Sequence, residues 1–429
     1  MSKNLKYLLA AIAMLGNVAS FGETIAINGA TIFTMHDAGV IENGTVLIRN
    51  GKIDSIGSAI EIPQDARVID ATGSVVTPGL FDPHSYLGVV EISLIAATVD
   101  SVQSDGRYSA SFRVSDAINP RSTLIPINRI EGVTRAIVAP QSSHEAGSSP
   151  ISGLGAAIQL GSTEDVVTHS DIALFVVLGE KGADLSGGSR SNTLLKLSEA
   201  LEDARAFQAD REGYDAGQSR EYSLSRPDLE ALQPVLKGEI PIVAHAHRAS
   251  DIDVAMNLAD EFGFRLVISG GAEAWLVADR LSSARVPVIL NPLENLPGQF
   301  ESLGATLSNA ARLHEAGVLV AFSTEDSHNA RGMKQLAGNA VANGLPYETG
   351  LAAITRNPAK IFGLDDVVGS LVPGKDADIV IWNTDPLELN AFAMHVFIAG
   401  RQIPMISRST LLRDRYLDPD DTLPRAYSD

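Results

Sequence analysis

The chain has 429 residues, of which 45% are hydrophobic, so it is long enough to bury a large core and too apolar to be disordered. Its formal net charge of -19 excludes nucleic acid and anionic membranes as expected partners, because their phosphates would be repelled. The absence of cysteine from the sequence excludes disulfides, thiolate catalysis and thiolate metal ligands.

The first 22 residues have the composition of a secretory signal peptide. Lys3 and Lys6 precede the apolar run YLLAAIAMLGNVAS, and small residues follow near Ser20 and Gly22. The alternative is a membrane anchor, but a spanning helix needs about 20 apolar residues and this run is shorter. We therefore expect residues 1–22 to be cleaved and the mature chain to be secreted into a periplasm, without a stable membrane anchor.

Residues 23–76 are predicted to form a small antiparallel sheet. Their short apolar runs are interrupted by Asn-Gly pairs, a strong hairpin signal, at 28–29, 43–44 and 50–51. A sheet this small cannot bury its own face. A strand pattern returns in residues 368–410, so we expect both ends of the chain to build one small composite β-sandwich. Residues 411–429 are polar and are predicted to be a surface tail.

Residues 77–367 show short buried runs that alternate with amphipathic stretches, which is typical of parallel βα units. Seven runs are visible: VVTPGLFDPHS, TRAIVAP, DIALFVVLG, IPIVAHAH, FRLVISGG, VPVILNP and GVLVAFST. We expect the eighth strand between Leu94 and Ile130, where STLIPINRIEGV reads as a helix that leads into the next strand. The predicted fold is α/β, a TIM-like (β/α)8 barrel beside the composite β-sandwich.

Five segments resemble, in content and in order, those of the amidohydrolase superfamily: NGKIDSIG, VIDATGSVVTPGLFDPHS, IPIVAHAHRASDI, TRNPAKIFGL and GSLVPGKDADIVIW. The resemblance is to the imidazolonepropionase-like and prolidase-like branch, and it covers nearly all of the chain after residue 22. It implies a hydrolase that cleaves an amide, cyclic amide or peptide-like C–N bond with a metal-activated water. It also implies metal ligands at the carboxyl ends of strands one, four, five, six and eight.

Measured against this resemblance, part of the metal-ligand set is missing. The first strand retains His84, but Tyr86 stands where a second imidazole would be, and the sixth-strand position is Gly270. On the fifth strand His245 matches a family ligand. His247 lies on the same face because strand side chains alternate, so we expect it to contact substrate. The two imidazoles could also replace the missing first-strand pair, or simply bond to neighbouring backbone.

The acid expected at the end of the eighth strand is Glu325 or Asp326, in AFSTEDSHNAR. Adjacent strand residues face opposite sides, so only one of them can reach the site. Glu325 is the first choice as metal ligand and general base, with Asp326 as the alternative. Arg331 could bind a substrate carboxylate at the barrel mouth. Glu180 and Lys181, near the fourth strand, are predicted to lie in a polar loop.

Three functional hypotheses follow. In the first, His84, His245 and Glu325 hold at most one divalent metal, with Zn²⁺ as the first choice, and hydrolyse a small-molecule substrate. In the second, the protein is catalytically inactive and keeps the barrel mouth as a ligand pocket, because two ligand positions are substituted. In the third, Tyr86, His245 and His247 perform metal-free acid–base chemistry. The sequence leaves the substrate and the formation of a homo-oligomer open.

Overall fold

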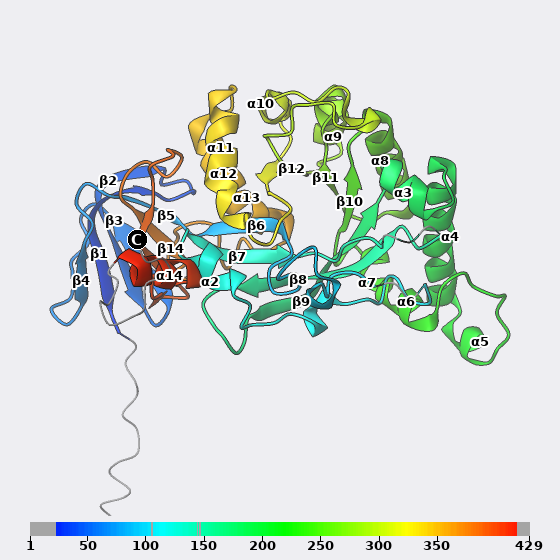
Figure 1. The fold of residues 1–429 in the computed structure, drawn as a ribbon, viewed down its shortest axis with the longest axis horizontal. Helices are drawn as coiled ribbons and strands as arrows, with labels where there is room; N and C mark the ends of the chain where they lie inside the picture. The colour runs from blue at the N-terminus through cyan, green and yellow to red at the C-terminus, as the bar shows by residue number, and fades with distance from the viewer. Residues whose placement is uncertain (1–22, 104–105, 144, 146, 418–429) are drawn as a thin grey trace, which may run out of the picture.

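The computed structural model describes residues 23–103, 106–143, 145 and 147–417. These residues form two sheets of eight strands each, and the helices gather around the larger sheet (Figure 1). The signal peptide expected at residues 1–22 lies outside the described residues. Within the part of the chain that is described, no helix is both long and apolar enough to cross a membrane.

The smaller sheet is built from both ends of the described chain, in the order β16-β15-β14-β5-β1-β2-β3 with β4 beside β1. The two ends meet where β14 pairs with β5 in antiparallel fashion. They therefore share one sheet, as the sequence predicted. Its strands are β1 (Ile25–Phe33), β2 (Val40–Arg49), β3 (Lys52–Gly57), β4 (Arg67–Asp70), β5 (Val75–Pro78), β14 (Ile379–Trp382), β15 (Ala393–Ile398) and β16 (Arg401–Gln402).

Only one of the three Asn-Gly pairs forms the expected hairpin turn. Asn50 and Gly51, with φ of 53° and 80°, connect β2 to β3 as a two-residue turn. The pairs at 28–29 and 43–44 instead lie inside β1 and β2, where the register between these strands shifts. Residues that tolerate positive φ serve equally well in a β-bulge, which explains why these two predictions were wrong.

The larger sheet is a nearly closed barrel, in the order β13-β12-β11-β10-β9-β8-β7-β6. At the two ends of this order, the Ser323 hydroxyl lies 2.7 Å from Asp82 Oδ1 and 2.6 Å from the His84 carbonyl oxygen. The strands are β6 (Leu80–Ser85), β7 (Val133–Val138), β8 (Ile151–Gln159), β9 (Val167–Val177), β10 (Ile242–Ala246), β11 (Leu266–Gly270), β12 (Val288–Leu290) and β13 (Val320–Phe322).

The eighth strand is not where the sequence analysis placed it. The described residues between 94 and 130 contain two short 3-10 helices and α2 (Leu124–Arg129) but no strand. The missing strand is β8, which runs antiparallel to both β7 and β9. Its small residues allow tight packing: a Cβ added at Gly155 would lie 2.4 Å from the Phe175 ring. The barrel thus has seven parallel strands and one reversed strand.

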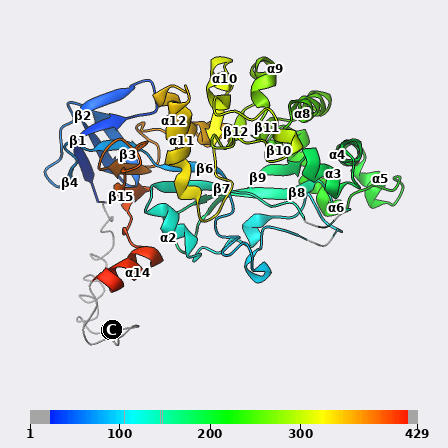
Figure 2. The same cartoon turned by 45° about the horizontal axis from the view of Figure 1, so that its top comes forward.

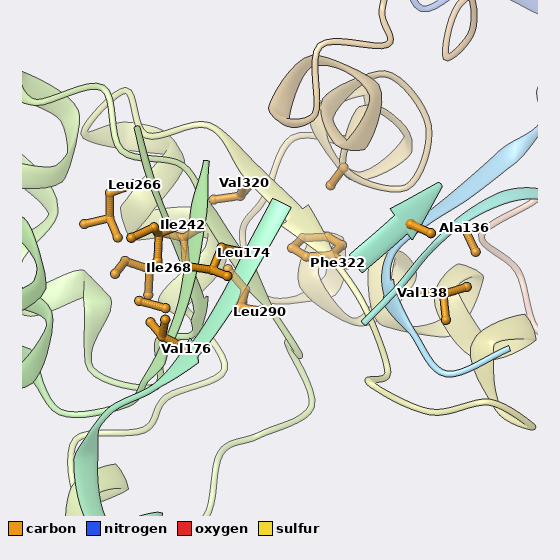
Figure 3. Packing of buried hydrophobic residues seen from close by; sticks show 14 of the residues in the cluster. Ala136, Val138, Leu174, Val176, Ile242, Leu266, Ile268, Leu290, Val320 and Phe322 are labelled. Atoms are coloured by element: carbon orange, nitrogen blue, oxygen red, sulfur yellow. The ribbon is translucent and has the colours of Figure 1, made fainter. Parts of the chain in front are cut away.

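Strand side chains alternate between two apolar layers. Leu174, Val176, Ile242 and Ile268 belong to the large outer core that packs against the helices (Figure 3). The residues next to them along each strand, such as Val243, point to the opposite side and belong to the inner core of the barrel.

The helices in the described part of the chain are α2, α3 (Gly179–Leu185), α4 (Arg190–Ala209), α5 (Arg211–Asp215), α6 (Arg226–Ala231), α7 (Gln233–Leu236), α8 (Ala249–Phe262), α9 (Ala278–Ser283), α10 (Asn309–Glu315), α11 (Met333–Ala342), α12 (Tyr347–Ala353), α13 (Arg356–Ile361) and α14 (Arg408–Leu417).

A buried ion pair joins the two sheets. Arg135 on β7 donates to Asp378 at 2.7 Å and to Asp376 at 2.9 Å, just before β14. The ring of Trp382 on β14 is fully buried, and its Nε1 donates to Thr77 Oγ1 at 2.9 Å. The polar tail that was expected at residues 411–429 begins within α14. This helix has no buried residue among those described, and it lies at the edge of the molecule (Figure 2).

Candidate active site

A pocket of about 410 Å³ lies at the carboxyl ends of barrel strands, where active sites of such barrels are found. His245 comes from β10 and Ser269 from β11, while Glu325 follows β13. The polar side chains in its wall include His84, Tyr86, Gln141, Lys181, His245, Ser269 and Glu325.

Strand alternation explains why these side chains meet. Val243, Val267 and Ala321 point into the inner core of the barrel. Residues two positions further along each strand face the same way, so His245 and Ser269 also point into the barrel, at the carboxyl ends of β10 and β11. Glu325 follows the end of β13 and lies beside them. Its φ of 52° is uncommon for a residue other than glycine.

The centre of the site is a contact between two buried side chains, His84 and Ser269, and the partly exposed carboxylate of Glu325. The Ser269 hydroxyl lies 3.1 Å from His84 Nδ1 and donates to Glu325 Oε1 at 2.7 Å. His84 Nδ1 and Glu325 Oε1 are themselves 3.6 Å apart. Ser269 is 0% exposed and His84 is 6% exposed, so the serine links the other two groups and does not face solvent as a nucleophile.

Burial and charge set the protonation of this centre. Burial lowers the pKa of His84, and Glu325 raises it by less, so we regard His84 as neutral near pH 7 and its contact with Glu325 as no ion pair. Burial by itself would raise the pKa of Glu325. The pKa is nonetheless lowered below its usual range, because His245 lies nearby and the Ser269 hydroxyl donates to the carboxylate, so Glu325 is ionised.

Two further histidines pack together beside the carboxylate. His245 Nδ1 lies 4.0 Å from Glu325 Oε2, and the His245 side chain is 29% exposed. The rings of His245 and His247 meet edge to face with centroids 4.8 Å apart. His247 is buried, and its Nδ1 has no hydrogen-bond partner among the described residues. Burial, followed by the nearby His245, lowers the pKa of His247 to about 4.

Tyr86, which stands where the resemblance would place an imidazole, contacts the other side of His84. Its hydroxyl lies 3.4 Å from His84 Nε2, and both residues line the pocket. Burial raises the pKa of Tyr86 far above its ordinary value, so the phenol keeps its proton and can donate it in a hydrogen bond.

The remaining predicted residues lie in different surroundings. Asp326 Oδ1 accepts from the His328 amide at 2.8 Å, so this carboxylate holds its own loop. The amide of Arg331 donates to Asn128 Oδ1 at 2.7 Å. Neither side chain is among those that line the described pocket. The loop expected at Glu180 and Lys181 is instead the first turn of α3, and Lys181 lines the pocket.

The sequence analysis missed two serines of the site. Ser269 joins His84 to Glu325, and the Ser323 hydroxyl accepts from the Glu325 amide at 2.9 Å. Each is a small polar residue at the end of an apolar run, VIS and VAFS, and this is the one feature that distinguishes them in the sequence.

The three residues expected to bind Zn²⁺ are not arranged for that role. Both ring nitrogens of His84 already face protein hydroxyls, of Ser269 and of Tyr86, and Ser269 occupies Glu325 Oε1. Across the described ranges, no three His, Cys, Asp or Glu side chains converge on a point that could hold a metal ion. As the structure places them, His84, His245 and Glu325 do not fit a metal, which corrects the expected ligand set.

The nearly closed barrel, with its polar pocket at the strand ends, defines the class of the protein by its fold: an α/β barrel with a candidate active site at the carboxyl ends of its strands. Residues 242–403 match the model of the amidohydrolase family. A solved structure of an amidohydrolase from Thermotoga maritima MSB8 superposes with a TM-score of 0.79 at 29% identity, covering 90% of this chain and 100% of that one. The chain is therefore similar to amidohydrolases over most of its length, and residues 242–403 match the family model itself.

Relatives of known name extend the comparison. An imidazolonepropionase from Aromatoleum aromaticum is 27% identical over 396 residues, which are 85% of this chain and 92% of the relative. The amidohydrolase tasK from Hapsidospora irregularis is 26% identical over 83% of this chain. The matched region spans 39% of that longer relative. A molinate hydrolase structure, at 17% identity and a TM-score of 0.52, shows a shared fold alone.

Proposed function

We propose that the protein hydrolyses a C–N bond of a small molecule, of the amide, cyclic amide or peptide-like kind, in this pocket. The observation that carries the proposal is the pairing of a pocket-facing imidazole, His245, with the ionised carboxylate of Glu325. Similarity to proteins named amidohydrolase and imidazolonepropionase supports the bond type.

The residues present suggest how the reaction would proceed. His245 takes a proton from a water molecule in the pocket, and the hydroxide adds to the carbonyl carbon of the substrate. Glu325 stabilises the imidazolium that forms. Lys181, in the same wall, donates a hydrogen bond to the carbonyl oxygen as negative charge develops there. The C–N bond then breaks, and His245 returns the proton to the departing nitrogen.

The proposal is tested with purified protein and a panel of N-acyl amino acids, cyclic amides and dipeptides. Mass spectrometry would follow the appearance of a new carboxylate and a new amine. We expect turnover of at least one class, and we expect His245→Gln to lower its rate about 10²- to 10⁴-fold, the usual contribution of a general base. Binding of such compounds without turnover would support the inactive ligand-binding protein, and equal rates for the variant would exclude the role of His245.

We further propose that the mature chain acts in a periplasm, after removal of residues 1–22. The support is the arrangement of Lys3, Lys6 and the apolar run that follows them. N-terminal sequencing of the protein from its host should give a start between Phe21 and Thr24. A membrane-associated form that begins at Met1 would contradict the proposal.

A further inference from the structure

The hydrogen bonds around His84 have a consistent direction. The carboxylate of Glu325 can only accept, so the Ser269 hydroxyl donates to it and accepts from His84 Nδ1–H. This requirement puts the imidazole proton on Nδ1 and leaves a lone pair on Nε2. The Tyr86 hydroxyl faces that lone pair at 3.4 Å and can donate to it. Donors and acceptors therefore run in one order, from Tyr86 through His84 and Ser269 to Glu325.

This order leaves His84 with no free lone pair for a metal. A neutral histidine binds a metal through an unprotonated ring nitrogen, whereas here Nδ1 carries the proton and Nε2 faces a phenol. The hydroxyl of Ser269 sits between His84 and Glu325, two of the side chains that the family resemblance would assign to the metal. Ser269 is fully buried, so its hydroxyl is held among protein groups.

The two positions where the sequence departs from the family pattern both lie against histidines of the site. Tyr86 supplies the hydroxyl that faces His84 Nε2. At Gly270, a Cβ would lie 3.0 Å from His247 Cε1 and 3.2 Å from His245 Cε1, so a side chain there would crowd both rings. Both positions are therefore compatible with the packing of the histidines in this site.

We propose that the Ser269 hydroxyl takes the linking position that a metal would hold, and that this amidohydrolase site is built to remain metal-free. The inference rests on the geometry of the site and is independent of which bond the protein cleaves. Ser269 is a positioning residue, which holds His84 and Glu325 in place.

Zinc binding tests the inference without any substrate. The purified full chain would be stripped with a chelator and dialysed against Zn²⁺ alone, and the retained metal would be measured by elemental analysis. We expect no bound equivalent above that of a His84→Ala, His245→Ala control. One equivalent of Zn²⁺ that is retained by the unmodified protein and lost in this control would overturn the proposal.

Nitrogen NMR of the histidine rings tests the role of Ser269 directly. In the unmodified protein we expect His84 as the Nδ1–H tautomer. Ser269→Ala should shift the Nδ1 signal, whereas Tyr86→Phe should mainly shift the Nε2 signal. Ser142→Ala, which removes a hydroxyl from the same pocket, is the matched control and should move neither. Unchanged His84 signals in Ser269→Ala, or a proton on Nε2 in the unmodified protein, would contradict the proposed order.

Discussion

At the scale of single residues, Gly270 was correctly identified as a position of the site, but the reason for its glycine was misinterpreted. The absence of a side chain there was interpreted as the loss of a metal ligand. The structure gives Gly270 a φ of 89° and places the rings of His245 and His247 where its side chain would be. The glycine is thus a requirement of the present packing.

This explanation predicts the cost of Gly270→Ala. Gly73 has a similar φ of 77° and no atom within 4 Å of an added Cβ, so Gly73→Ala measures backbone strain alone. We expect that control to lose about 1–2 kcal/mol of unfolding free energy. Gly270→Ala should lose clearly more, because its Cβ also meets the two imidazoles. Chemical denaturation of both variants gives the comparison, and equal losses would show that the rings adjust without cost.

The sequence did not show which side chains meet across the barrel. Glu325 and His245 were found because each stands at a position where the family resemblance implies a metal ligand. Ser269 was missed because serine is common and because its partner His84 is 185 residues away in the chain. Glu325 was the first choice over Asp326 from the sequence, and Glu325 is the one that lines the pocket, although no sequence pattern indicates its positive φ.

At the scale of elements, the reversed strand β8 marks where pattern reading failed. The apolar runs that feed parallel strands were recognisable, and seven of them form barrel strands. The segment ISGLGAAIQ was overlooked because glycine and alanine weaken the strand pattern. Its direction follows from the short connection to β9, since neighbouring strands joined this closely pair in antiparallel fashion.

The ion pair between the two sheets predicts a second stability difference. Arg135 is largely buried and satisfies both Asp376 and Asp378, whereas Lys52 reaches the same Asp376 from an exposed position. Arg135→Ala should cost about 3–5 kcal/mol, because it leaves a buried carboxylate unpaired. Lys52→Ala should cost about 1 kcal/mol or less. Thermal and urea unfolding would measure both, and similar losses would mean that burial does not govern this interface.

At the scale of the whole molecule, the two ends of the described chain form one sheet, and the residues between them form the barrel. The pairing of β5 with β14 follows from a general argument, because each terminal segment is too small to bury a sheet face alone. The alternating apolar runs and the family resemblance both predicted the barrel, and the resemblance also predicted the position of the site. What it could not supply was the internal arrangement of that site, since His84, Ser269 and Glu325 come from three different strand ends that only the folded barrel brings together.

The central claim is that Glu325 supports catalysis by His245 in this pocket. The most direct measurement is kcat/KM of Glu325→Gln relative to the unmodified protein, on the best C–N substrate from the panel. The amide keeps the size of the side chain and an oxygen that can accept from Ser269, but it removes the negative charge beside His245. We predict a loss of about 10²-fold or more, with the fold unchanged by circular dichroism. A variant that retains full kcat/KM would contradict the account.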